Sequence, residues 1–139
     1  MKKQLVKAIF LTLLLAALPA FAATDHGRHD HGSADHVIAG TATEAGIKAT
    51  LKVNRAHSMV DLFLVDAATG APVTSGKATA NIKLPNGKTL EKELIGMKMG
   101  QEYSFMNSLD LSLNGRYVFD VYVASGSKQA KFGFVYTAK

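Results

Sequence analysis

Most of the chain after residue 45 alternates between apolar and polar residues. In residues 47–54, an isoleucine, an alanine, a leucine and a valine occupy every second position. A period of two gives a strand one buried face and one solvent-facing face. Residues 58–66 are apolar on both faces, which is typical of a central strand. Similar patterns predict further strands in residues 78–84, 89–94, 103–113, 117–123 and 131–136.

Turn-forming residues separate the predicted strands. The sequence Pro-Asn-Gly at residues 85–87 predicts a hairpin, because Asn-Gly suits a turn that needs positive φ. Residues 114–115 predict a second hairpin, residues 96–100 a loop, and residues 125–127 a connection between the last two strands. About seven short strands without a helix must bury sheet faces against each other, so we expect an all-β, antiparallel, immunoglobulin-like sandwich. A closed barrel is the alternative that the strand count leaves open.

The first 22 residues have a different pattern. Three lysines precede an apolar run at residues 8–18, and Ala20-Phe21-Ala22 matches a signal-peptidase site. The apolar run is shorter than the roughly 20 residues that span a bilayer. We therefore expect a cleaved signal peptide at 1–22, a disordered Asp/His-rich arm at 23–39 and a β-sandwich domain at 40–139. The mature protein would be periplasmic or secreted, with no membrane span.

Composition excludes several functions. The formal charge of +5 falls to +2 without the three leader lysines, and the remaining basic residues are scattered, which argues against nucleic-acid binding. The chain has no cysteine, so it forms no disulfide and has no thiolate nucleophile. It also has no Gly-x-Ser-x-Gly sequence, no glycine-rich phosphate loop and no paired carboxylates. We expect neither an enzyme nor an organic cofactor.

The strongest candidate for chemistry is the segment from residue 25 to residue 36, DHGRHDHGSADH, which we call the Asp-His tract. It contains four of the chain's five histidines, and Asp-His pairs recur at a spacing of five residues. Neutral imidazole binds transition metals, and a neighbouring carboxylate orients the ring or ligates directly. The tract therefore predicts a site for copper, zinc or nickel. The candidate ligands are His26, His29, His31, His36, Asp25, Asp30 and Asp35. The alternative is a polar tail that only aids solubility.

A second metal site is a further hypothesis. His57 and Met59 form an H-x-M pair, and Met97 and Met99 flank a lysine between two glycines. Thioethers favour Cu(I), and residues at i and i+2 project from the same side of a strand. The four residues would form a site if residues 96–100 meet the segment before residue 58. Methionine is also a common filler of cores, so packing is the alternative.

The body of the chain resembles a known family. GMKMG at 96–100 is followed by a strand, a turn and the sequence GRYVFDVYV at 115–123, and Gly70 and Pro72 precede the strand at 78–84. Over about residues 45–136 the chain is similar to the YtkA-like family of small exported domains. The aromatic residue near the family's C-terminus, often tryptophan, is replaced by Phe132 or Phe134. The resemblance implies an immunoglobulin-like domain that often accompanies heavy-metal efflux or copper-handling systems, and it implies no catalytic residues.

These observations predict a periplasmic transition-metal-binding protein that uses the Asp-His tract. Its role would be that of a metal buffer, a chaperone or an accessory to a metal efflux or metal-enzyme assembly complex. The alternative is a non-catalytic envelope adaptor whose polar tail is incidental. The sequence leaves the identity of the metal and its stoichiometry open.

Overall fold

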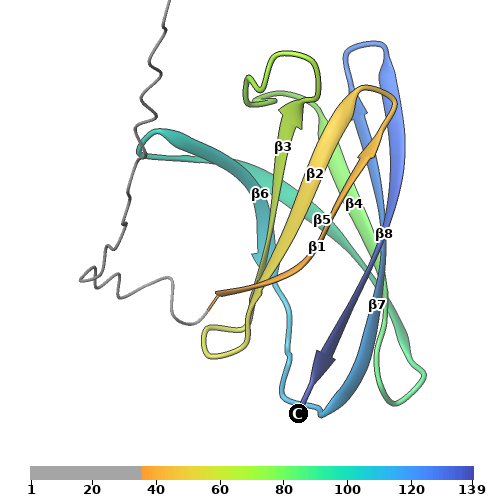
Figure 1. Cartoon of the computed structure of the whole chain (residues 1–139). Helices are drawn as coiled ribbons and strands as arrows, with labels where there is room; N and C mark the ends of the chain where they lie inside the picture. Colours follow the sequence, from red (N-terminus) through yellow and green to blue (C-terminus); the bar gives the residue numbers. More distant parts are fainter. Residues whose placement is uncertain (1–35) are drawn as a thin grey trace, which may run out of the picture. The chain divides into compact units, whose positions relative to one another are not determined.

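A computed structural model describes residues 36–139 of the chain, and these residues form eight β-strands (Figure 1). No helix occurs in this range, so nothing in it has the length and apolarity of a helical membrane crossing. The strands are β1 (His36–Glu44), β2 (Ile47–Asn54), β3 (Met59–Asp66), β4 (Lys77–Lys83), β5 (Thr89–Met99), β6 (Glu102–Ser108), β7 (Gly115–Ser125) and β8 (Lys128–Ala138).

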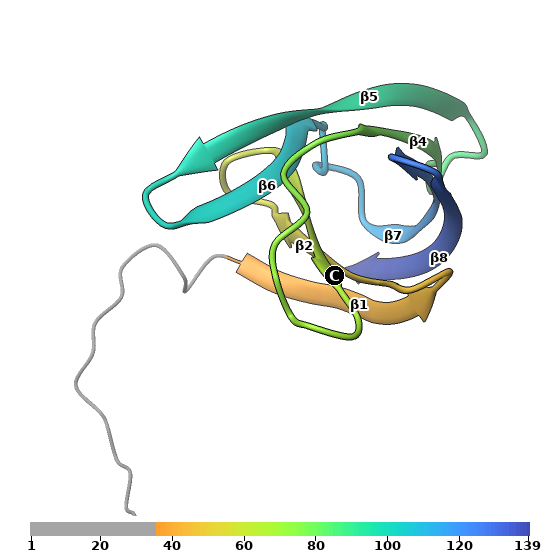
Figure 2. The same ribbon diagram turned by 90° about the horizontal axis from the view of Figure 1, so that it is seen from above.

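All paired strands are antiparallel, in the order β1-β2-β3-β6-β5-β4-β7-β8. The long β5 belongs to two sheets, because residues 89–94 pair with β4 and residues 95–99 pair with β6. We call β1, β2, β3, β6 and the end of β5 the first sheet, and the start of β5 with β4, β7 and β8 the second sheet. Figure 2 shows both sheets curving around one interior. The prediction of an all-β antiparallel fold is confirmed.

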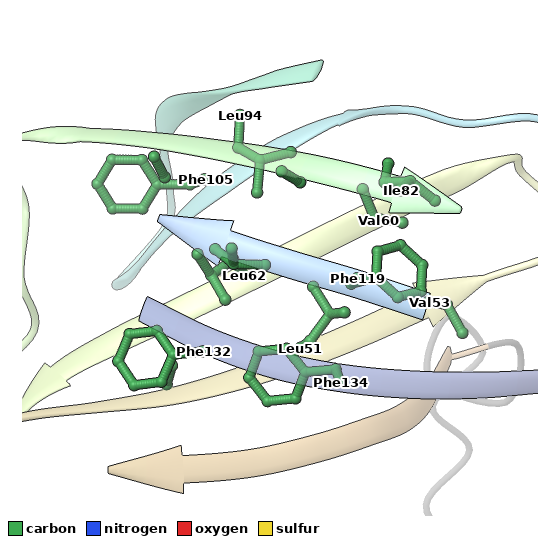
Figure 3. Close-up of a cluster of buried hydrophobic side chains, with 14 of the residues drawn as sticks. Leu51, Val53, Val60, Leu62, Ile82, Leu94, Phe105, Phe119, Phe132 and Phe134 are labelled. Carbon is green, nitrogen blue, oxygen red and sulfur yellow. The ribbon is translucent and has the colours of Figure 1, made fainter. Parts of the chain in front are cut away.

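The two sheets enclose one apolar core. Leu51 and Leu62 from the first sheet face Phe119 and Phe132 from the second, and all four side chains are buried (Figure 3). At the open edge, a Cβ atom on Gly40 of β1 would lie 2.8 Å from the ring of Phe134 in β8. Only a glycine allows β1 and β8 to approach this closely, so the sandwich nearly closes without hydrogen bonds between these two strands.

The structure begins with a strand that the sequence pattern does not predict. β1 begins at His36, so the predicted boundary between residues 39 and 40 falls inside a strand. Its pairing with β2 shifts between Ile38 and Gly40, which is a β-bulge. A bulge interrupts the period of two, and for this reason the alternation in β1 is weak. The domain therefore has eight strands where about seven are predicted.

Two predicted turns and one predicted strand also differ. Residues 96–99 continue β5 and do not form a loop. Strand β6 ends at Ser108, and residues 109–113 are irregular although Leu109 and Leu111 are buried. Residues 114–115 do not close a hairpin, because β6 and β7 belong to different sheets. The hairpins at 85–88 and 126–127 are confirmed by the pairing of β4 with β5 and of β7 with β8.

Candidate metal centre

Only the last residue of the Asp-His tract lies in the part of the chain that the structure describes. Asp25, His26, His29, Asp30, His31 and Asp35 lie outside the described residues. His36 opens β1 and pairs with Asn54 at the end of β2. The last predicted ligand is therefore built into the edge of the first sheet.

The outer face of the first sheet carries two rows of side chains, and the polar and thioether groups in these rows include His36. Side chains alternate along a strand, and Val60 and Leu62 of β3 face the core. Met59 and Asp61 therefore face outward. The register sets out the first row as His36, Asn54, Met59 and Ser108. The second row contains Ile38, Lys52, Asp61, Met106 and Ile95.

Asp61 is the most deeply buried charged side chain in these rows, with 7% of its surface exposed. Its Oδ2 lies 3.3 Å from Nε2 of His36. This contact runs diagonally from the first row to the second. Its Oδ1 is buried and has no hydrogen-bond partner among the described residues. Burial raises the pKa of the Asp61 carboxyl, although His36 and Lys52 act in the opposite direction.

Asn54 connects the two histidines of the described domain. Its Nδ2 lies 3.4 Å from His36 Nε2, and its Oδ1 lies 3.2 Å from His57 Nδ1. The same Oδ1 accepts a hydrogen bond of 2.9 Å from the backbone N–H of His57. Because Asn54 is buried, these contacts hold the turn between β2 and β3 against the first row.

The structure does not bring the predicted second site together. Met97 pairs with Ser104 and Met99 pairs with Glu102, at the far end of β5. Met97 is thus two strands away from Met59, and about four residues or roughly 13 Å further along the sheet. The side chains of Met97 and Met99 are 47% and 55% exposed. A single site that uses the His57–Met59 pair together with Met97 and Met99 would require this sheet to rearrange.

Sequence reasoning did not single out Asn54, Asp61 or Met106. One signal was present, because Asp61 is the only charged residue inside the apolar run at 58–65. A charge in the middle of a central strand is costly unless it has a partner or a function. Within residues 36–139, no three His, Cys, Asp or Glu side chains cluster to hold a metal. A site here must therefore use another donor type beside the His36–Asp61 pair.

Comparisons with known proteins show the fold. No protein-family model and no curated protein matches the sequence. FetP of uropathogenic Escherichia coli strain F11, expressed in the periplasm, is 9% identical, with a TM-score of 0.61 over 75% of this chain and 97% of that chain. Copper-reconstituted P19 of Campylobacter jejuni is also 9% identical, with a TM-score of 0.61 over 75% of this chain and 96% of that chain. Membership of the YtkA-like family stays a prediction.

Proposed function

We propose that the chain is an exported transition-metal-binding protein of the periplasm. It uses the Asp-His tract to buffer a metal ion or to pass it to an efflux or assembly complex. The observation that carries this proposal is the position of His36, which ends the tract and lies 3.3 Å from the carboxylate of Asp61. The tract thus meets the domain at a histidine and an aspartate, two residue types that commonly ligate metals.

Two further observations favour copper over zinc and nickel. Copper(II) binds more tightly than the other two ions to sites of nitrogen and oxygen donors. Among structures with this fold, an E. coli FetP variant and a Campylobacter jejuni P19 variant are described as copper-bound. Imidazole must be deprotonated to ligate, so the affinity of the tract falls as the pH drops through about 6.5.

Calorimetry of the exported chain with Cu²⁺, Zn²⁺ and Ni²⁺ tests the proposal. The matched variant replaces His26, His29 and His31 with alanine and leaves the described domain unchanged. We expect tight binding of Cu²⁺ to the wild-type chain and a loss of most of the bound copper in the variant. Binding weaker than about 1 mM for all three ions at neutral pH would contradict the proposal and favour the adaptor alternative.

A further inference from the structure

We propose that His36, Asp61 and Met106 form a copper site on the outer face of the first sheet. It lies in the folded domain and does not require the ligands that precede residue 36. The inference extends the proposed function and rests on it in part, because His36 belongs to both the tract and the domain. The three residues come from β1, β3 and β6, so the fold alone determines their spacing.

The distance between His36 and Asp61 suits two ligands of one ion. A charge-assisted N–H···O hydrogen bond is usually about 2.7–2.9 Å long. His36 Nε2 and Asp61 Oδ2 are 3.3 Å apart. Two donors that each bind tetrahedral Zn²⁺ at about 2.0–2.1 Å lie roughly 3.3–3.4 Å from each other. The pair therefore has the separation of neighbouring metal ligands.

Asp61 supplies an independent reason to expect a ligand. Its Oδ1 is buried without a hydrogen-bond partner among the described residues. Buried polar atoms in folded proteins nearly always have a partner, so an unsatisfied carboxylate oxygen is uncommon. A cation bound by both carboxylate oxygens and by His36 would neutralise the buried charge and would give Oδ1 a partner as well as Oδ2.

Lys52 does not supply the missing partner of Asp61 Oδ1 in the described structure. Lys52 faces Asp61 from the neighbouring strand β2. Its Nζ instead lies over the ring of Phe63, 4.7 Å from the ring centroid. Phe63 is two residues beyond Asp61 on the same face of β3. The ammonium group of Lys52 therefore lies over a side chain next to Asp61 along the strand.

Met106 provides the third donor and the selectivity for copper. It pairs directly with Asp61 across β3 and β6, and facing residues have Cβ atoms about 4.5–5.5 Å apart. Its side chain is partly buried. A thioether is a soft ligand that favours Cu(I), and imidazole binds copper in both oxidation states. Within this set of donors, the thioether therefore favours copper over zinc or nickel.

The test uses the exported chain with His26, His29 and His31 replaced by alanine, so that His36 is the only histidine left in the tract. Copper is titrated as Cu(I) against a colorimetric chelator under reducing conditions. We expect one Cu(I) per chain in this background. Adding Asp61→Asn, His36→Gln or Met106→Leu should lower the affinity by at least about tenfold, because each change removes a ligand.

Controls separate the loss of a ligand from the loss of the fold. Met97→Leu removes an exposed thioether from the same face and should leave the Cu(I) affinity unchanged. Thermal unfolding of each variant without copper shows whether it is folded. Because Asp61 is buried, His36→Gln at the partly exposed edge provides a second test that does not disturb the interior.

The outcomes also distinguish this site from the tract. One Cu(I) per chain in both the wild-type chain and the three-histidine variant supports the domain site, whereas the role of the tract is decided separately by the Cu²⁺ calorimetry of the same two chains. Copper bound by the wild-type chain but not by the variant overturns the domain site and leaves the proposed function intact. Equal affinity after His36→Gln, or a loss of binding only with Met97→Leu, also overturns it.

Discussion

Strand β3 carries two aspartates whose surroundings differ sharply. Asp66, at its end, has a partner for each oxygen. Its Oδ1 accepts hydrogen bonds from the backbone N–H groups of Ala68 and Thr69 at 2.9 and 3.0 Å, and its Oδ2 lies 3.3 Å from Lys128 Nζ. Asp61, five residues earlier, has one oxygen beside His36 and one without a hydrogen bond among the described residues.

The difference separates a structural carboxylate from a candidate ligand. The hydrogen bonds to Asp66 favour its charged form and lower its pKa, whereas burial of Asp61 raises its pKa. Both oxygens of Asp66 are engaged, and its role is to form the turn after β3. Asp61 retains an unused lone pair in a sheltered position, and this is the property that metal binding requires.

The largest effect on stability should come from the opposite face of the same strand. Leu62 is fully buried beside Asp61 and points into the core. We expect Leu62→Ala to lower the free energy of unfolding by about 2–5 kcal/mol, because it leaves a cavity. Urea unfolding measures this change. A loss below about 1 kcal/mol would mean that the two faces of β3 are not assigned correctly.

Replacing the buried aspartate should act in the opposite direction. In the absence of copper, we expect Asp61→Asn to raise the free energy of unfolding by about 1 kcal/mol at neutral pH. The change removes a buried charge that has an oxygen without a hydrogen bond among the described residues. Urea unfolding with a metal chelator present measures it. A marked loss of stability would show that the carboxylate holds the sheet together and is not reserved for a ligand.

The two carboxyl groups should titrate on opposite sides of the ordinary pKa value of 3.8. The folded-state pKa of Asp61 is raised, so the cost of its charge is present at neutral pH and is relieved as the pH falls through that pKa. The folded-state pKa of Asp66 is lowered, so its contribution is present above 3.8 and is lost as the pH falls through its folded pKa. Carboxyl ¹³C NMR of the copper-free chain checks both directions. A midpoint for Asp61 below that of Asp66 would reverse the comparison.

The smallest effect should come from Lys128, which pairs with Asp66 at the surface. Lys128→Met removes this ion pair but keeps both backbone hydrogen bonds to the carboxylate. We expect a slight fall in the unfolding temperature that disappears in about 1 M salt, because exposed ion pairs are weak and screened. Copper affinity should not change. An altered copper affinity would show that the two ends of β3 are coupled.

The sequence predicts most strands but not their irregular neighbours. β2 and β4 alternate cleanly, and they form where the pattern places them. Residues 109–113 also alternate, yet Asp110 Oδ1 accepts a hydrogen bond from Ser112 N, and Arg55 binds the carbonyl oxygens of Leu111 and Ser112. These contacts hold the segment as an irregular crossing between the sheets. Alternation reports which side chains are buried, and it does not report where the backbone finds its hydrogen bonds.

The candidate site could be predicted only in part. The close spacing of histidines in the Asp-His tract predicted His36 as a ligand, because this spacing can be read directly from neighbouring residues in the sequence. Asp61 is 25 residues further along and meets His36 across β2, so their contact depends on the register of two strand pairs. Met106 is added by a third pairing, between β3 and β6. Only the folded sheet brings these three residues together.

A crystal structure of the copper-loaded chain tests the central claim most directly. Anomalous scattering at the copper edge locates the ion without reference to the protein density. We predict a peak within bonding distance of His36 Nε2, an Asp61 carboxylate oxygen and the Met106 sulfur. A peak beside His57 or Met97, or no peak in contact with Asp61, would contradict the proposed site.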